Sequence, residues 1–216
     1  MKEKIVLVGS GQHARVVLYN IKEQGKYEVI CMLDSDESKI GQYVEGIKIV
    51  DTYDDLEVVS KKYETNKFFI AFGNMKYRKK VFEHFVNNGW EAVNIIHPNA
   101  VVSPSAVIGK GVLIECGCLI TPNPVIGDNV VINTGSQVNH DNIVENHVYI
   151  ASGVVLSGGV TIKENTLLDD GVIVTLGRTV GANSLIGAGG VVTRDIQDGV
   201  ICYGNPAKVI RNNTNI

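Results

Sequence analysis

The sequence has few aromatic residues, little net charge and no long apolar run, and each absence excludes a class of protein. Aromatic residues make up 6% of the 216 residues, and the net charge is −3. Without clustered Lys and Arg the chain lacks the basic surface that nucleic-acid binding requires. No apolar run approaches the roughly 18 residues that a membrane span needs. The opening residues MKEKIVLVGSG predict a strand and a turn, so we expect no signal peptide and a cytoplasmic protein.

Cysteine is also scarce, and its positions are Cys31, Cys116, Cys118 and Cys202. This spacing matches neither a zinc site nor a CxxC redox motif, so we expect reduced thiols and no bound metal. Cys116 and Cys118 as a nucleophile or ligand pair is the alternative interpretation. We favour a structural role, because small buried residues are what the interior of a repeat needs.

Residues 1–95 alternate short apolar runs with segments of helical periodicity. The apolar runs that predict strands are Lys4–Gly9, Tyr27–Asp34 and Lys67–Gly73. Helices are predicted over Gln12–Gln24, Asp54–Lys62 and Asn74–Asn88, the last headed by Asn74 and closed by Gly89. Such an alternation predicts an α/β domain in which helices cover a small parallel sheet.

From Ile96 onward the period changes to six. Every sixth residue is Ile, Val or Leu: Ile96, Val102, Ile108, Ile114, Ile120, Ile126, Ile132, Val138, Val144, Ile150, Leu156, Ile162, Leu168, Val174, Val180, Ile186 and Val192. A period of six fits neither a helix nor an ordinary strand and is typical of hexapeptide-repeat parallel β-helices. Three hexapeptides close one triangular coil, and stacked coils bury a continuous aliphatic column.

The positions around this column agree with it. Two residues before each aliphatic stand mostly small or β-branched residues, namely Ala100, Ala106, Val112, Cys118, Val130, Ser136, Val148, Val154, Val160 and Thr166. The expected turns carry residues that tolerate a left-handed backbone, namely Gly109, Gly127, Asp128, Asn129, Asn165, Asp169, Gly181 and Gly187. The unbroken period indicates that no loop interrupts the β-helix.

Several motifs in this order resemble one family. They are GSGQHA after the first strand, AFGN (residues 71–74), HPNAVVSPSAVIG (residues 97–109), NHD (residues 139–141) and YGNPAKVIR (residues 203–211). Together they resemble the bacterial hexapeptide-repeat sugar acetyltransferases of the bacillosamine, perosamine and sialic acid pathways. The resemblance covers essentially the whole chain. It implies a Rossmann-like nucleotide-sugar-binding domain over residues 1–95 and a left-handed β-helix that binds acetyl-CoA over residues 96–216. It also implies a homotrimer with the coenzyme between neighbouring β-helices.

The pair His140 and Asp141 suits acetyl transfer. The nucleophile must lose a proton, and imidazole is the natural base near neutral pH. An adjacent carboxylate can select the tautomer of the imidazole and stabilise its cation. The family places its base at this histidine, so His140 is the expected general base and Asp141 its orienting partner. His147 is expected to be a solvated turn residue, and His84 and His97 are expected to be structural.

The resemblance also implies the residues that contact acetyl-CoA. Relatives often carry a second histidine near the acetyl group, where this chain has Tyr149. The pantetheine arm is expected to contact the chain at Gly158, Asp170 and Ala188. Lys208 and Arg211, in the final motif, are the expected cations for the coenzyme phosphates.

In the first domain the resemblance implies a nucleotide-sugar site. GSGQHA lacks the third glycine of a dinucleotide fingerprint, and the family binds a UDP-sugar there rather than NAD. The matching positions are Gly11, Gln12, His13, Asp34, Ser35, Gly73 and Asn74, and Asn133 is expected to hold the sugar near His140.

The predicted function is therefore acetyl transfer from acetyl-CoA to a UDP-4-amino-4,6-dideoxy sugar for surface glycan biosynthesis. The sequence does not separate N- from O-acetylation, so a sialic acid O-acetyltransferase is an alternative. A non-catalytic scaffold is a further alternative from another class, although it would not need the His–Asp pair. A metal enzyme of the carbonic anhydrase type would need about three convergent histidines, and only His140 and His147 are close in sequence. A NAD dehydrogenase is disfavoured, because the first domain is too short for the two-half fold.

Overall fold

The computed structural model describes residues 1–214 of the chain. It divides into two compact units, Met1–Ile95 and Ile96–Ile216. No helix among the described residues is long and apolar enough to cross a membrane.

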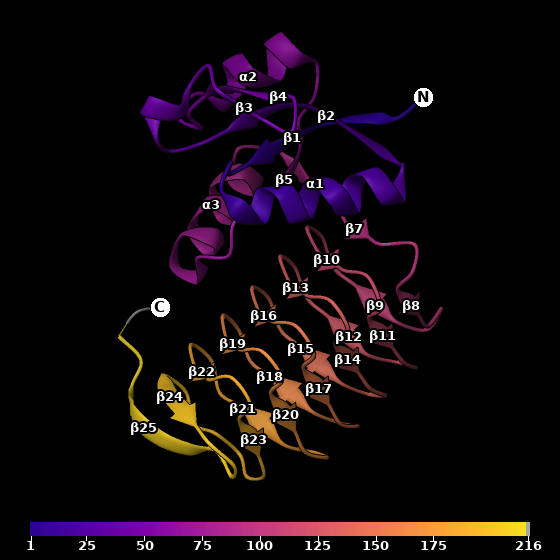
Figure 1. Cartoon of the computed structure of the whole chain (residues 1–216), viewed down its shortest axis with the longest axis vertical. Coiled ribbons are helices and arrows are strands. Elements are labelled where there is room, and N and C mark those ends of the chain that lie inside the picture. The colour runs from indigo at the N-terminus through magenta and orange to yellow at the C-terminus, as the bar shows by residue number, and fades with distance from the viewer. Residues whose placement is uncertain (215–216) are drawn as a thin grey trace. The chain divides into compact units, whose positions relative to one another are not determined.

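The first unit is built on a six-stranded sheet (Figure 1). Its spatial order is β3 (Tyr43–Val44), β4 (Ile47–Asp51), β2 (Tyr27–Leu33), β1 (Glu3–Val8), β5 (Lys67–Ile70) and β6 (Glu91–Ala92). All neighbours are parallel except the β3–β4 hairpin. The helices are α1 (Gln12–Gln24), α2 (Leu56–Tyr63) and α3 (Met75–Asn87), with a short 3₁₀ helix at Glu37–Lys39. The predicted α/β domain is confirmed, although the short strands β3, β4 and β6 were not predicted.

Aromatic side chains between the sheet and the helices form the core of this unit. Phe68 stacks on Phe85 with ring centroids 4.6 Å apart, and the edge of Trp90 meets Phe85 at 5.2 Å. Arg78 of α3 is buried and its Nη1 donates to the carbonyls of Ile70 and Phe72. This guanidinium therefore fastens the end of β5 to α3.

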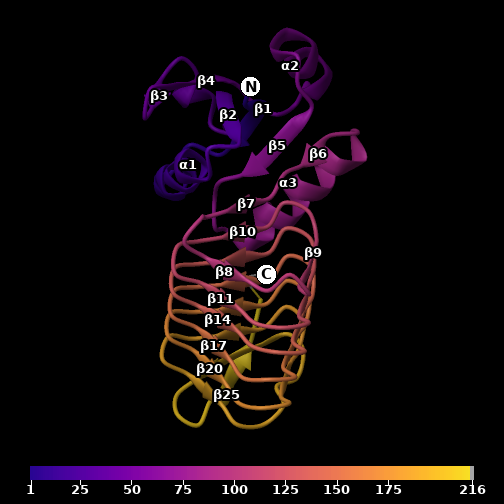
Figure 2. The ribbon, with the colours of Figure 1, turned by 90° about the vertical axis from the view of Figure 1, so that its right-hand side faces the viewer.

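The second unit is a left-handed parallel β-helix with three sheets along its sides (Figure 2). The eight-stranded sheet comprises β7 (Ile95–Ile96), β10 (Leu113–Ile114), β13 (Val131–Ile132), β16 (Tyr149–Ile150), β19 (Leu167–Leu168), β22 (Leu185–Ile186), β24 (Val200–Tyr203) and β25 (Lys208–Asn212). The six-stranded sheet comprises β8 (Val101–Val102), β11 (Leu119–Ile120), β14 (Gln137–Val138), β17 (Val155–Leu156), β20 (Ile173–Val174) and β23 (Val191–Val192). The five-stranded sheet comprises β9 (Val107–Ile108), β12 (Val125–Ile126), β15 (Ile143–Val144), β18 (Thr161–Ile162) and β21 (Thr179–Val180). The predicted fold class is confirmed.

The aliphatic column of the sequence is the core of the β-helix. From Ile114 to Val192 each of its members is at most 1% exposed, and pairs such as Ile120 with Val138 lie in register on adjacent coils. Ile96, Val102 and Ile108, at the first coil, are only partly buried. Each fully buried aliphatic side chain contributes roughly 1.5–3 kcal/mol, so the column is the main stabilising element of this unit.

Polar side chains that point inward bond to backbone groups of the coils. Ser136 Oγ donates to the Ala151 carbonyl at 2.8 Å, and Asn142 Oδ1 accepts from the Val160 amide at 2.7 Å. Cys118 is buried and its Sγ donates to the Asn133 carbonyl. Burial raises the pKa of this thiol to about 11, so Cys118 is not a thiolate nucleophile at neutral pH.

The left-handed backbone positions also recur every six residues. They are Gly111, Gly117, Asn123, Asn129, Gly135, Asp141, His147, Gly153, Gly159, Asn165, Gly171, Gly177, Asn183 and Gly189. Most are Gly or Asn, because these residues adopt a positive φ at least cost.

The turn residues predicted to adopt a left-handed backbone mostly do not adopt it. Of the residues expected in the left-handed region, Asn129 and Asn165 have a positive φ, whereas Gly109, Gly127, Asp128, Asp169, Gly181 and Gly187 do not. The glycine positions among them require glycine instead because a side chain would clash with neighbouring atoms. A Cβ on Gly127 would lie 2.4 Å from Asn146 Oδ1 and 2.8 Å from the Asn146 amide of the next coil.

We therefore expect Gly127→Ala to destabilise the β-helix by about 1–3 kcal/mol, the usual cost of forcing an atom into a packed contact. The matched control is Gly153→Asn, at a positive φ with nothing within 4 Å of its added Cβ. This control should unfold close to the native midpoint in urea. Equal midpoints for Gly127→Ala and the native chain would contradict the steric explanation.

Candidate active site

The turns of the β-helix stack into three columns, which we name by the sheet they follow. The first corner follows the eight-stranded sheet, the second the six-stranded sheet and the third the five-stranded sheet. Their residues are 115–117, 133–135, 151–153, 169–171 and 187–189 for the first, 121–123, 139–141, 157–159 and 175–177 for the second, and 109–111, 127–129, 145–147, 163–165 and 181–183 for the third. Residues 18 apart stack in the same column, because each coil contains 18 residues.

His140 and Asp141 lie on the second corner, directly after β14. His140 Nδ1 lies 2.9 Å from Asp141 Oδ2, and Asn123, one coil earlier, donates to Asp141 Oδ1 at 3.3 Å. The hydrogen bond from His140, followed by the one from Asn123, lowers the pKa of Asp141 below its ordinary value. Since a carboxylate can only accept, Nδ1 is the donor in this contact, and in the neutral imidazole Nε2 is then the nitrogen with the free lone pair. Asn123 was not predicted from the sequence; its signal is its place 18 residues before Asp141.

Gly158 leaves the space that the His140 imidazole occupies. It lies one coil after His140 on the same corner, and a Cβ there would lie 2.3 Å from His140 Nε2. The His140 carbonyl accepts from the Gly159 amide at 2.9 Å, which holds the two coils in register. The imidazole therefore lies against bare backbone with Nε2 beside Gly158, while 60% of the His140 side chain remains exposed.

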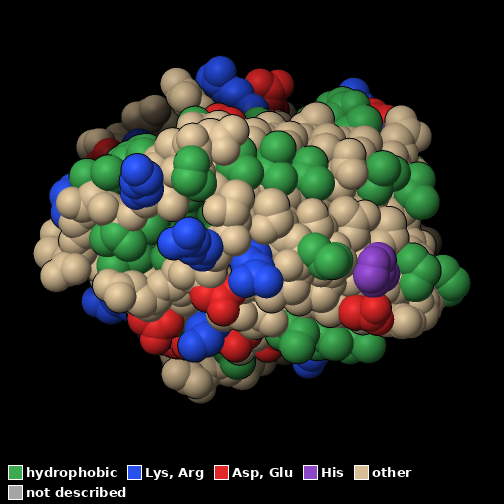
Figure 3. All heavy atoms as spheres, turned by 90° about the horizontal axis from the view of Figure 1, so that it is seen from below, with side chains coloured by type: hydrophobic (Ala, Val, Ile, Leu, Met, Phe, Trp, Pro, Cys, Tyr) green, Lys and Arg blue, Asp and Glu red, His purple; other side chains and the backbone are tan. Residues whose placement is uncertain are grey.

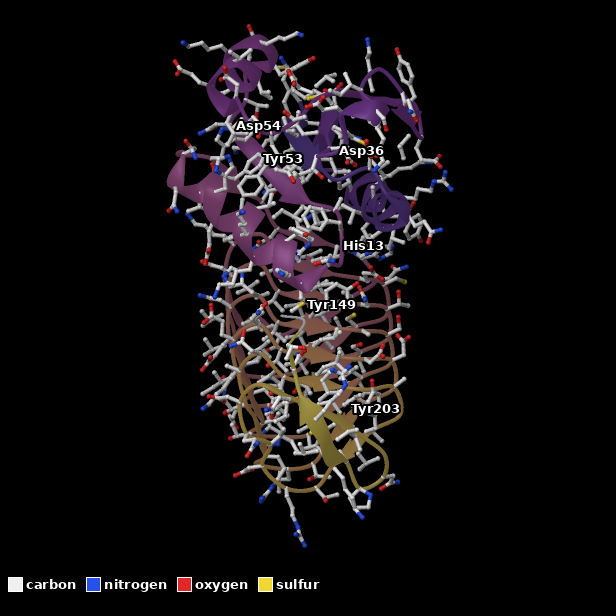
Figure 4. The ribbon with its side chains drawn as sticks, turned by 90° about the vertical axis from the view of Figure 1, so that its left-hand side faces the viewer. His13, Asp36, Tyr53, Asp54, Tyr149 and Tyr203 are labelled. Atoms are coloured by element: carbon white, nitrogen blue, oxygen red, sulfur yellow. The ribbon has the colours of Figure 1, made fainter. Side chains whose placement is uncertain are left out.

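The other predicted residues of the β-helix lie along a different column. Asn133 follows β13 on the first corner, and its Nδ2 lies 3.1 Å from the hydroxyl of Tyr149 in β16. Asp170 and Ala188 occupy the first corner two and three coils later. The structure thus brings Asn133 and Tyr149 together, but within one chain Asn133 lies on the first corner and Tyr149 in β16, whereas His140 lies on the second corner. Figure 4 shows Tyr149 and Tyr203 on the β-helix.

Two cationic residues were predicted near the C-terminus. Lys208 and Arg211 both lie in β25, which pairs antiparallel with β24, and both are exposed. Asp170, by contrast, uses Oδ1 to accept from the Ser152 amide at 3.0 Å. Its carboxylate therefore also caps the preceding coil.

His147 is not the solvated turn residue that was predicted. It is 6% exposed, has a φ of 62° on the third corner, and its Nδ1 lies 2.9 Å from Asn129 Nδ2. It occupies a column that also holds Gly111, Asn129, Asn165 and Asn183, and its burial follows from that stacking. His97 is buried and its Nδ1 accepts from the Asn99 amide, whereas His84 lies 3.2 Å from the Tyr53 carbonyl.

The first unit contains a cavity of about 530 Å³ beside the carboxyl ends of β1 and β2. Ligands of open α/β sheets bind at this kind of edge. Of the predicted residues, Gly11, Asp34, Ser35 and Asn74 line it. Lining residues that were not predicted are Gly9, Ser10, Lys39, Tyr53, Phe72 and Tyr77. Of these lining residues, Tyr53 is labelled in Figure 4.

Asp34 organises one wall of this cavity. The amide and hydroxyl of Ser10 donate to its Oδ2, the Asp36 amide donates to Oδ1 at 3.0 Å, and Lys39 Nζ lies 3.1 Å from Oδ2. Burial alone would raise the pKa of Asp34, but these donors outweigh it and lower the pKa. Asp34 therefore holds the β1–α1 turn and positions Lys39.

Three other predicted residues, Gln12, His13 and Gly73, are not among the lining residues of the cavity. Gln12 is exposed in the first turn of α1, and Gly73 is exposed between Phe72 and Asn74. The Asn74 side chain accepts from the Tyr77 amide and so caps α3. His13 is mostly buried, and burial, followed by the positive charge of Arg78, lowers its pKa to about 4.

No group of three or more His, Cys, Asp or Glu within residues 1–214 could hold a metal ion. On the face seen in Figure 3, Lys and Arg side chains are interspersed with Asp and Glu, and exposed apolar side chains form separate groups.

Comparison with known proteins identifies relatives of both units. Residues 4–85 match the family model described as the PglD N-terminal domain. The chain is similar to GDP-perosamine N-acetyltransferase from Caulobacter crescentus, crystallised as a histidine-to-alanine variant with CoA and GDP-perosamine. That similarity has 34% identity, 97% coverage of both chains and a TM-score of 0.91. A second similar structure is the acetyltransferase domain of PglB from Neisseria gonorrhoeae FA1090 with acetyl coenzyme A. It shows 31% identity, 97% coverage of this chain and 100% of the other, and a TM-score of 0.88.

Among curated proteins, UDP-N-acetylbacillosamine N-acetyltransferase from Bacillus subtilis (strain 168) is 33% identical over 114 residues. The alignment covers 52% of this chain and 51% of that protein, so the chain spans about half the length of this curated relative.

The lowered pKa of His13 predicts a pH-dependent stability. The unfolded chain takes up a proton near pH 6.5, whereas the folded chain does so only near pH 4, so stability is lost as the pH falls. We expect a loss of about 2 kcal/mol between pH 7.5 and pH 5 from this residue. Urea unfolding at both values should show a smaller loss for His13→Asn. The same loss in both proteins would contradict the prediction.

Proposed function

Because the chain belongs to the bacterial hexapeptide-repeat sugar acetyltransferases of the perosamine and bacillosamine type, we propose that it transfers the acetyl group of acetyl-CoA to a nucleotide-activated amino sugar. The observation that carries this proposal is the His140 imidazole, whose Nδ1 faces Asp141 and whose Nε2 lies beside the bare backbone of Gly158. The Caulobacter and Neisseria relatives were crystallised with CoA or acetyl-CoA.

In the proposed reaction His140 acts as general base and no acyl-enzyme forms. Nε2 takes a proton from the sugar amine, and the nitrogen attacks the thioester carbon directly. Asp141, whose pKa is lowered, remains a carboxylate and stabilises the imidazolium. The tetrahedral intermediate then collapses, the C–S bond breaks, and the proton held on Nε2 passes to the departing thiolate. The products are the acetamido sugar and CoA.

The proposed coenzyme contacts are Tyr149, Gly158, Asp170, Ala188, Lys208 and Arg211. Tyr149 would donate its hydroxyl to the thioester oxygen at the place where relatives have a second histidine. Gly158 and Ala188 leave room for the pantetheine arm along the corners. Lys208 and Arg211 are exposed cations suited to phosphate groups.

These groups occupy two corners of one β-helix, which favours a site shared between chains. His140 and Gly158 lie on the second corner, whereas Asn133 and Asp170 lie on the first, and Tyr149 in β16 accepts a hydrogen bond from Asn133. A triangular prism separates its corners by the width of a sheet. We propose a homotrimer in which the second corner of one chain faces the first corner of its neighbour, so that each interface completes one site.

The acceptor's nucleotide is proposed to bind in the cavity of the first unit. Gly11 precedes α1 and lines the cavity, and the first turn of α1 contains no acidic residue. The backbone amides at the start of a helix can bind a phosphate. Lys39 adds a cation, and Phe72, Tyr53 and Tyr77 offer aromatic faces. Gln12, His13, Ser35 and Gly73 remain proposed contacts of the same ligand. Our specific proposal is a UDP-4-amino-4,6-dideoxy sugar, in line with the Bacillus subtilis relative.

Release of free thiol from acetyl-CoA tests the reaction with UDP- and GDP-linked 4-amino sugars and with free sialic acid. We expect turnover with a UDP-linked amino sugar, a loss of roughly 10²–10⁴-fold in kcat for His140→Ala, and a loss also for Gly158→Ala, which displaces the imidazole. His84→Gln, at a histidine that the reaction does not use, should keep the native rate.

Each acceptor decides one part of the proposal. Turnover with the GDP-linked sugar alone would replace UDP as the nucleotide. Turnover with sialic acid alone would overturn N-acetylation. An unchanged rate in His140→Ala would remove that residue as the base.

Mixed oligomers test the shared site. His140→Ala alters the second corner, and the double variant Asn133→Ala/Tyr149→Ala alters the first corner. Each variant alone should be impaired, and co-expression should restore about a quarter of the native rate, since one interface in four then combines two intact corners. Co-expression of His140→Ala with Gly158→Ala, both on the second corner, is the matched control and should restore nothing. Absence of recovery in the first mixture would show that each chain works alone.

A further inference from the structure

The second corner continues beyond His140 as a strip of chemically distinct residues. Its second position holds His140 after β14, Gly158 after β17 and Leu176 after β20. Arg194 stands two residues after β23 in the same way. These four strands are consecutive neighbours in the six-stranded sheet, so the four residues follow one another along the helix axis.

The length of this strip follows from strand spacing. Neighbouring strands lie about 4.8 Å apart, so three coils separate His140 from Arg194 by about 14 Å along the axis. The strip therefore runs from a proton acceptor, over bare backbone at Gly158 and an apolar side chain at Leu176, to a cation.

Leu176 is an exposed apolar residue on this strip. Its relative exposure is 67%, the highest among exposed large apolar residues of the β-helix, and its position is a turn rather than a sheet face. A single exposed leucine is ordinary by itself. Here it stands on the coil directly after Gly158, where an apolar ligand passing that glycine would meet it.

Arg194 is an exposed cation at the far end of this strip. Its neighbour Asp195 lies 3.8 Å from Arg178 Nη1, and Asp195 Oδ1 also accepts from the Thr179 amide at 3.0 Å. Within residues 1–214, Arg194 takes part in no ion pair. The nearest carboxylate in sequence is thus engaged elsewhere, and the guanidinium is available to an anion.

We propose that Leu176 and Arg194 bind the coenzyme, with Leu176 contacting the pantetheine arm and Arg194 its pyrophosphate. This inference rests on the proposed acetyl transfer and adds two binding residues to it. Acetyl-CoA matches the strip in order: a thioester at His140, a largely uncharged arm over Gly158 and Leu176, and a diphosphate at the cation. Arginine binds phosphate through paired N–H donors, which suits this end of the strip.

Three acetyl donors separate the contacts: acetyl-CoA, its 3′-dephospho form, and S-acetylpantetheine, which has no phosphate. For Arg194→Ala we expect KM to rise about tenfold with acetyl-CoA and with dephospho-acetyl-CoA, at unchanged kcat. With S-acetylpantetheine the native protein and Arg194→Ala should be equal, and Arg194→Lys should recover part of the affinity. For Leu176→Gln we expect KM to rise severalfold with all three donors, since the lost contact is to the shared arm.

Matched controls separate these effects from general changes of charge or polarity. Lys110→Ala removes an exposed cation at the same turn position of the third corner, and Val58→Gln replaces an exposed apolar residue of α2. Both should keep the native KM. All substituted residues are exposed, and thermal unfolding checks that each variant is folded.

Calorimetric measurement of CoA binding separates a failure of this inference from a failure of the proposed function. If the native protein does not bind CoA, the acetyl-transfer proposal itself fails. If it binds CoA and Arg194→Ala binds it equally well, the assignment of Arg194 is wrong. A loss in Arg194→Ala that is confined to donors with the 3′-phosphate would overturn the pyrophosphate contact.

Discussion

The inward aliphatic column is the constraint on which the second unit depends. Each coil must repeat after 18 residues so that Ile or Val stacks on Ile or Val and each strand bonds to the next. That repeat places turn residues in columns and brings successive turns into close contact. Gly127 has no side chain because the next coil lies against it, and the left-handed backbone recurs at fixed positions because each corner turns in the same way. The same stacking explains why His147 is buried in a column of asparagines.

The proposed chemistry uses the places that this repeat leaves open. The interior is occupied by aliphatic side chains, so reactive groups can stand only on the corners and outer faces. His140 lies on a corner where the next coil has glycine, and Asp141 adopts the left-handed turn position that brings its carboxylate back to Nδ1. A straight prism also offers a linear track, along which an extended coenzyme can contact one residue per coil. Its corners are too widely separated for one chain to surround a substrate, which is the physical reason to expect a neighbour.

In the first unit the topology of the parallel sheet determines where the cavity lies. A parallel sheet with β1 at its centre leaves a crevice where the chain departs to opposite sides, and the cavity lies there. The Asp34 carboxylate already accepts from Ser10, the Asp36 amide and Lys39. Its role at the cavity is therefore to hold the wall in shape. Backbone amides at the start of α1 and the Lys39 cation are the groups suited to a diphosphate.

The sequence by itself determined the β-helix, because a strict period of six has one structural solution, and it determined the alternation of strands and helices in the first unit. It also indicated the pairing of His140 with Asp141, since neighbours in a turn meet locally. Only the tertiary structure decided which distant residues meet. The contact of Gly158 with His140, the support from Asn123 and the separation of Asn133 from His140 all depend on which corner a residue occupies. The cavity side chains Lys39, Tyr53 and Tyr77 come from three separate segments, and no local pattern marks them as neighbours. The strands β3, β4 and β6 escaped prediction because two to five residues carry too little periodicity, and only pairing with the sheet makes them strands.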